Sequence, residues 1–303
     1  MKKLLLVAIV TLAMALAMAG VALADGGPHG GYTATTDACA GCHRAHTASG
    51  PNLLIEASTY DLCLACHGTA GAGANTNVDD GVYLATRDDA ASDENWGAAN
   101  ATTNILLGGG FINYNGAAAS STHDSDGSEA AAWGNGVARG ATADLASGLT
   151  CASCHDPHGS NNYRIMNETI NGNAVAAELV DEGLPNKDYD TEQWGAGMSG
   201  ICAACHDDYH QTAAGQGSIL DGASYTHRID MAYNYDGNDN PETVGMDGNF
   251  LPLAEADQVV CMTCHLPHGT NAAMSTLAIG PNTGDTDLLR LDNRGVCEVC
   301  HQK

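Results

Sequence analysis

The sequence predicts a loop-rich chain with short α-helices and a few short strands, wrapped around a core that side chains alone do not supply. Among its 303 residues are 37 glycines and only two phenylalanines. Aromatic side chains usually dominate core energetics, so too little apolar surface is left to offset the entropy of ordering the chain. The pentapeptide Cys-x-x-Cys-His recurs six times and accounts for all 12 cysteines. The group that this pentapeptide binds therefore decides the fold.

The pentapeptide is typical of covalent attachment of c-type haem. Each cysteine can add to one vinyl group of the porphyrin, because two cysteines three residues apart lie on one face of a helical turn. The next histidine then lies over the iron as its proximal ligand. The attaching cysteines are Cys39 and Cys42, Cys63 and Cys66, Cys151 and Cys154, Cys202 and Cys205, Cys261 and Cys264, and Cys297 and Cys300, and the proximal histidines are His43, His67, His155, His206, His265 and His301. Zinc also uses Cys-x-x-Cys half-sites, but it would not require a histidine after every second cysteine.

We therefore expect six covalently attached haem c groups, with the polypeptide wrapping a linear stack of six haems that forms the core. Short helices would carry the attachment sites. The long segments between them, rich in Gly, Ala, Asn, Asp and Ser, indicate turns and a few short strands. Disorder is the alternative for such composition, but histidines embedded in these segments would hold them to the haems.

Residues 1–24 are interpreted as a secretory signal peptide. Lys2 and Lys3 precede an apolar run that ends near Val21, and Ala22-Leu23-Ala24 is an A-x-A cleavage signature. The alternative is an uncleaved membrane anchor, because the apolar run is almost long enough to span a membrane. No later stretch of the sequence is long and apolar enough to do so. We expect the mature chain to comprise residues 25–303 and to be exported to the cell surface or the extracellular space, with the periplasm as the alternative.

The charge of the chain limits its partners. The formal net charge is −25, and loss of the signal peptide would remove two lysines and no acid. We therefore expect neither nucleic-acid binding nor binding to anionic membranes.

The six sites form three pairs, which we interpret as three repeats at about 25–70, 120–210 and 222–303. The first site of each pair continues as Cys-His-x-x-His, and this adds His46, His158 and His268. The repeat unit is thus His … C-x-x-C-H-x-x-H … C-x-x-C-H. The upstream histidine is His123 in the second repeat and His227 in the third, and His29 is a poorer match in the first.

The histidine count nearly matches six bis-histidine irons. Of 13 histidines, six are proximal, and the repeats supply two distal candidates each. Either His29 or His210 is then the spare. A histidine three residues after its proximal ligand lies on the same side of the porphyrin, so His46, His158 and His268 should each reach the iron of a neighbouring haem. A methionine such as Met231 or Met246 could replace one histidine and raise the potential of that haem.

With its doubled C-x-x-C-H motifs, three C-x-x-C-H-x-x-H sites and signal peptide, the chain resembles secreted multihaem c-type cytochromes. It is most similar to the hexahaem members that polymerise into extracellular filaments of metal-reducing bacteria, and to their archaeal relatives. The resemblance implies haems that alternate between parallel-stacked and T-shaped pairs. It also implies that one distal histidine, His46 by motif position, is donated to a neighbouring copy of the chain.

Three functions are compatible with these sequence features. The first is a head-to-tail filament that carries electrons to redox partner proteins or extracellular metal oxides. The second is a monomeric electron shuttle in the periplasm or at the cell surface. The third is a multihaem reductase, which would need an iron with an open position. The histidine count disfavours an open position, so we expect electron transfer and no enzymatic activity.

Overall fold

The computed structural model describes residues 29, 39–71, 74, 76–83, 105–133, 142–145, 147–178, 194–210, 227–233, 251–254, 258–275 and 286–301. The expected signal peptide lies outside these residues. Within them the chain is loop-rich, as expected, with short helices and very short strands. None of the helices in the described ranges combines the length and the apolar character that crossing a membrane requires.

The helices are short and most of them carry a Cys-x-x-Cys segment. The α-helices are α2 (Thr59–His67), α3 (Cys151–Cys154), α4 (Ser199–Ala203), α5 (Cys261–Cys264) and α7 (Gly295–Cys300). The 3-10 turns are η2 (Cys39–Gly41), η3 (Pro51–Leu53), η5 (Tyr163–Ile165), η6 (Asp207–Tyr209) and η9 (Asp292–Arg294). The Ser58 side chain caps α2 by accepting a hydrogen bond from the Asp61 amide at 3.0 Å.

The strands of the described residues form two-stranded antiparallel ladders. The pairs are β1 (Thr76–Asn77) with β2 (Val82–Tyr83), β3 (Asn113–Tyr114) with β4 (Ala117–Ala118), β5 (Ser121–Thr122) with β12 (Gly269–Thr270), β6 (Ala131–Trp133) with β7 (Thr142–Asp144), β8 (Thr169–Ile170) with β9 (Asn173–Ala174), and β10 (Met231–Ala232) with β11 (Gln258–Val259). The ladder of β5 and β12 joins the second repeat to the third, with Gly269 opposite Thr122.

Within the described ranges, buried apolar side chains gather in two clusters. The larger lies around α4 and α5 and includes Met198, Val260 and Trp194. The smaller packs Val296 and Val299 of α7 against Leu251. Clusters of this size offset little ordering entropy, so a further apolar component is needed to hold the chain.

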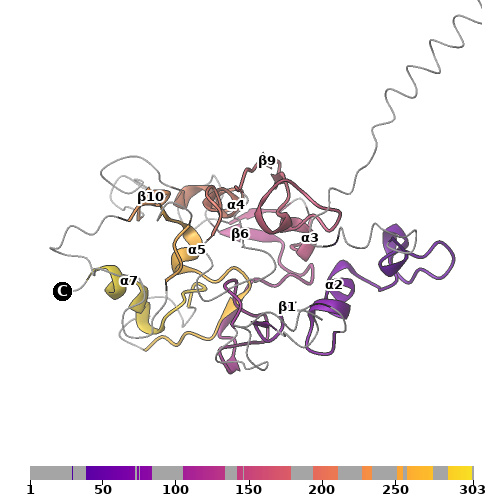
Figure 1. Ribbon diagram of the computed structural model, residues 1–303, viewed down its shortest axis with the longest axis horizontal. Coiled ribbons are helices and arrows are strands. Elements are labelled where there is room, and N and C mark those ends of the chain that lie inside the picture. The colour runs from indigo at the N-terminus through magenta and orange to yellow at the C-terminus, as the bar shows by residue number, and fades with distance from the viewer. Residues whose placement is uncertain are drawn as a thin grey trace, which may run out of the picture.

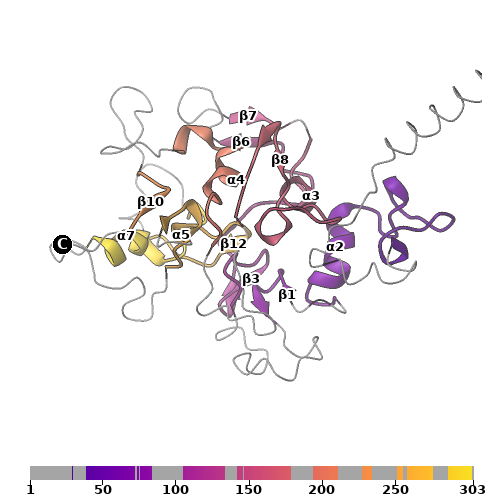
Figure 2. The same cartoon turned by 45° about the horizontal axis from the view of Figure 1, so that its top comes forward.

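The attachment helices follow one another across the molecule. Figure 1 shows α2 near one end, α3, α4 and α5 in the middle, and α7 near the other end, and Figure 2 shows the same succession after rotation. The segment that contains the first site, before α2, projects from the body at the end away from α7. The first and last sites therefore lie at opposite ends of the molecule.

Candidate haem-binding sites

All six Cys-x-x-Cys-His segments lie in the described residues, and each forms a turn that sets both cysteines beside the following histidine. In five of them the histidine amide donates to the first cysteine carbonyl at 2.8–3.0 Å, as from His155 to Cys151. The sixth, at Cys63, lies within α2. All 12 cysteines lie in the described residues, and none of them forms a disulfide. The thiols are therefore available for the two thioether bonds of a c-type haem at each site.

The first site of each repeat is followed by the same backbone turn. His43, His155 and His265 form antiparallel bridges with Leu54, Met166 and Leu289, respectively. Two residues with positive φ precede each bridged residue: Asn52 and Leu53, Arg164 and Ile165, and Asp287 and Leu288. The three sites thus share a local structure, although the loop of the third repeat is longer.

These turns orient the proximal imidazoles. His43 Nδ1 lies 2.9 Å from the Asn52 carbonyl, His155 Nδ1 lies 3.1 Å from the Arg164 carbonyl, and His265 Nδ1 lies 2.6 Å from the Asp287 carbonyl. A carbonyl can only accept, so Nδ1 carries the proton and Nε2 keeps its lone pair. This tautomer leaves Nε2 free to bind iron, and the hydrogen bond fixes the orientation of the ring.

Five proximal histidines face a second histidine at nearly constant distance. The ring centroids lie 6.1 Å apart for His67 and His29, 6.2 Å for His43 and His158, 6.2 Å for His206 and His123, 6.3 Å for His155 and His268, and 6.2 Å for His301 and His227. With metal–nitrogen bonds of about 2 Å on each face, and a ring centre roughly 1.1 Å beyond each nitrogen, two axial imidazoles have centroids about 6.3 Å apart. The pairs therefore fit one iron between two imidazoles.

The pairs obey two rules. The upstream histidine of each repeat faces the second proximal histidine of that repeat: His29 with His67, His123 with His206, and His227 with His301. In the second and third repeats, the histidine of the x-x-His extension faces the first proximal histidine of the preceding repeat. Thus His158 faces His43, and His268 faces His155.

Three histidines stand outside the pairs. All 13 histidines are described, and among these residues His265 forms no ring contact with another histidine. His46 is exposed, and no described residue forms a hydrogen bond or ring contact with it. His210 lies with Nε2 at 2.8 Å from Asp230 Oδ2. Of the two alternatives for the first repeat, His29 thus faces a proximal histidine, whereas His210 pairs with a carboxylate.

Cysteines of consecutive sites lie next to each other. The thiols of Cys63 and Cys151 lie close enough to shift each other's pKa, as do those of Cys202 and Cys261. Further thiols of successive sites interact electrostatically: Cys42 with Cys66, Cys154 with Cys205, and Cys264 with both Cys297 and Cys300. The six sites therefore form one row in the order of the sequence.

Burial keeps several of these groups uncharged. It lowers the pKa of His155 and His265, and it lowers the pKa of His268 to about 3. Burial also raises the pKa of the Cys154 and Cys264 thiols to about 12. At neutral pH these imidazoles are neutral, which is the form that binds a metal, and these thiols are protonated.

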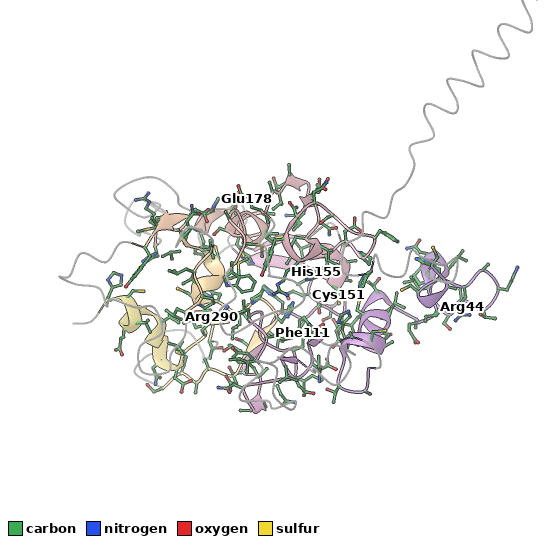
Figure 3. All side chains as sticks on the ribbon, viewed as in Figure 1. Arg44, Phe111, Cys151, His155, Glu178 and Arg290 are labelled. Carbon is green, nitrogen blue, oxygen red and sulfur yellow. The ribbon has the colours of Figure 1, made fainter. Side chains whose placement is uncertain are left out.

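Arg290 is a charged residue beside the sites that no sequence motif marks. Its Nε donates to the Met262 carbonyl at 2.8 Å, and its Nη2 donates to the Leu107 carbonyl at 2.7 Å. The guanidinium carbon lies 5.9 Å from the centre of the Trp194 ring. Burial lowers the pKa of Arg290 to about 10. Figure 3 shows Arg290 in the interior beside α5.

Phe111 also contacts a site. Its ring centre lies 4.9 Å from that of His268. The sequence marks neither Phe111 nor Arg290, because each is a single residue in a segment without a motif. The described residues contain no group of three or more His, Cys, Asp or Glu side chains that could hold a metal ion by themselves. Ten of the histidines instead face each other two by two, which fits a haem iron between two imidazoles and not tetrahedral zinc.

Comparison with known proteins supports the interpretation of the Cys-x-x-Cys-His sites. A family model described as "Doubled CXXCH motif" matches residues 32–72 and 143–173, which contain the sites at Cys39, Cys63 and Cys151. Such motifs bind c-type haem covalently. Together with the other Cys-x-x-Cys-His sites of the chain, this match supports a multihaem c-type cytochrome.

No curated protein sequence matches the chain. Among solved structures, the chain is similar to the Outer Membrane Cytochrome S Filament from Geobacter sulfurreducens, with 19% sequence identity and a TM-score of 0.34 over 83% of this chain and 90% of that chain. A TM-score this low does not establish a common fold.

Proposed function

We propose that the protein is a hexahaem electron-transfer cytochrome whose irons are held by two histidines each. The main support is a set of five histidine pairs whose ring centroids lie 6.1–6.3 Å apart. Each pair includes the histidine of a Cys-x-x-Cys-His site. Haem c, when bound, supplies an iron that gains and loses one electron. The chain supplies the thioether cysteines, the axial imidazoles and the carbonyls that orient them.

The row of sites supports a continuous path for electrons. Each site has a cysteine beside a cysteine of the next, and the first and last sites lie at opposite ends of the molecule. Electrons would enter at one end and leave at the other. A carrier of this kind needs no substrate pocket, only exposed sites at its two ends.

The second pairing rule predicts how one chain joins another. His268 of the third repeat faces His155 of the second, and His158 of the second faces His43 of the first. Continuing this series, His46 of the first repeat should face the first proximal histidine of a third repeat, which is His265. Both are left without a histidine partner among the described residues. We propose that His46 of one copy is the distal ligand of the iron at His265 in another copy.

This contact between two copies, called the joint below, is heterologous, because the first repeat of one copy meets the third repeat of the next. Repeating the contact gives an open filament rather than a closed dimer. Such a filament would extend the row of haems without limit. We further propose that the filament is extracellular and passes electrons to redox partner proteins or metal oxides, with a monomeric shuttle at the cell surface or in the periplasm as the alternative.

One observation favours a second candidate. In a single chain the iron at His265 has no second histidine from the described residues, so a monomer would present an open coordination position there. An open position is what a reductase needs. The site would then be catalytic in the monomer and closed in the filament.

Spin state as a function of protein concentration separates these functions. The haem-loaded chain should carry six haems by intact mass. When the chain is dilute, five haems should be low-spin and one high-spin, and the high-spin signal should disappear as the chains join. Six low-spin haems in a dilute monomer would contradict the proposed joint and favour the shuttle. A high-spin haem that persists in joined chains would favour the reductase.

A further inference from the structure

The upstream histidines of the first two repeats are held by the repeat that follows. His29 Nδ1 lies 3.0 Å from the Pro157 carbonyl, and His123 Nδ1 lies 2.7 Å from the Pro267 carbonyl. In both cases the carbonyl belongs to the proline that directly precedes the second histidine of a His-x-x-His extension. The same imidazole faces the second proximal histidine of its own repeat. One extension therefore contacts both sites of the repeat before it.

The junction of the second and third repeats shows both contacts together. His268 faces His155, and the Pro267 carbonyl accepts from His123, whose ring faces His206. The His123 amide also donates to the His268 carbonyl at 3.2 Å, next to the ladder of β5 and β12. The extension is thus seated by its backbone as well as by its histidine.

His227 is the corresponding histidine of the third repeat. Its Nδ1 lies 2.6 Å from the carbonyl of the adjacent Arg228. The side chain is exposed, unlike the partly buried His123. The carbonyl of a neighbouring residue therefore occupies the position that a following repeat fills elsewhere.

Ala45 is the matching residue of the first repeat. It lies between His43 and His46, at the position that Pro157 and Pro267 occupy in the later repeats. Ala45 is exposed, and its carbonyl accepts no backbone hydrogen bond from a described residue. The first repeat thus has a free acceptor at this position, and the third repeat has a donor that bonds only to the adjacent residue of its own chain.

We propose that the Ala45 carbonyl of a second copy accepts the Nδ1 hydrogen bond of His227 when two chains join. This contact rests on the proposed joint between His46 and the iron at His265. It adds a second point of contact between the two chains, at His227. The His43–His46 segment of one copy would then contact both sites of the third repeat of the other. The occupant of the surface around His227 is therefore a second copy of this chain.

The contact also acts on the site at His301. A hydrogen bond at Nδ1 sets the orientation of an imidazole and its strength as a ligand. In the single chain, the rings of His227 and His301 lie at 59°. Joining would move the acceptor of His227 from its own chain to the neighbour, so the last haem as well as the fifth should sense the joint.

A cryo-electron microscopy map of the joined, haem-loaded protein tests the contact directly. We expect the Ala45 carbonyl within about 3.2 Å of His227 Nδ1, with the Arg228 carbonyl released. If His46 binds the iron at His265 while His227 remains bonded to Arg228, this inference is wrong and the proposed joint stands. If the chains do not join, or join without His46, both are wrong.

A pair of variants tests the same surface in solution. Ala45→Trp should raise the concentration needed for joining by about tenfold or more, because the ring separates the carbonyl from His227. Ala117→Trp is the matched control, since Ala117 is exposed on β4, outside the first and third repeats. Ala45→Pro keeps the carbonyl and should join like the wild type. Normal joining of Ala45→Trp, or loss of joining in Ala45→Pro, would overturn the proposal.

Discussion

The imidazole rings of His43 and His158 lie 6.2 Å apart and within 10° of parallel, although the two residues belong to different repeats. His158 follows the proximal ligand of one site and faces the proximal ligand of another. In the proposed ligation the repeats would be linked by shared irons, in addition to the side-chain cluster around α4 and α5. Each haem site would then depend on two parts of the chain.

We expect His158→Ala to free the distal position of the haem at Cys39 and Cys42, and not that of the haem at Cys151 and Cys154. The reason is that His158 faces His43, whereas His155 faces His268. Electron paramagnetic resonance should show one new high-spin haem.

A second variant, which lacks the first haem, shows which haem becomes high-spin. In a chain whose first haem is absent because Cys39 and Cys42 are replaced by serine, His158→Ala should add no further high-spin signal. A signal that persists in this background would place His158 on a different iron.

We expect His210→Ala to leave every haem ligand in place. His210 Nε2 lies 2.8 Å from Asp230 Oδ2, so the substitution removes a hydrogen bond and not an axial ligand. The free energy of unfolding should fall by about 1 kcal/mol. The absorption spectrum should remain that of the wild type at the same concentration. If His210→Ala produces a new high-spin haem and His29→Ala does not, then His210 and not His29 is the distal ligand.

Arg290→Met should lower the reduction potential of the haems nearest to α5. The buried guanidinium disfavours the oxidised iron, which carries one more positive charge than the reduced iron. The shift should be on the order of tens of millivolts, because the charge acts across a partly desolvated interior. Spectroelectrochemical titration measures it. Arg44→Met is the control, since Arg44 is exposed, and an equal shift in both variants would refute a local effect of Arg290.

Without haem the chain should not fold. The strands are two or three residues long and the buried side chains form only small clusters, so the porphyrins must supply the missing apolar contacts. A chain exported without haem attachment should lack a cooperative unfolding transition by circular dichroism and should be degraded quickly by proteases. A cooperative transition in this material would show that the polypeptide has a sufficient core of its own.

The haem attachments could be predicted from the sequence because their chemistry is local. Two cysteines and a histidine within five residues specify a site wherever it lies in the fold. The loop-rich architecture also followed, since the chain has few aromatic residues and many glycines. The sequence further indicated that His158 must reach another haem, because the same-side geometry of His155 and His158 is local too.

The choice of partner could not be predicted, because it depends on how the repeats lie in space. Nothing near His158 in the sequence points to His43, and the sequence leaves His210 as an alternative to His29. The structure also places His46 and His265 outside the five pairs, which the histidine count alone does not show. Arg290 was missed because its importance comes from the carbonyls of Met262 and Leu107, and neither lies near it in the sequence.

The central claim is that His46 of one copy completes the iron site at His265 of the next. Its most direct measurement is electron microscopy of the haem-loaded protein, comparing the wild type with His46→Ala and with His210→Ala as a matched histidine control. We predict long unbranched filaments for the wild type and for His210→Ala, and single haem-loaded particles for His46→Ala. Filaments of His46→Ala that form at the wild-type concentration, or single particles in all three samples, would contradict the account.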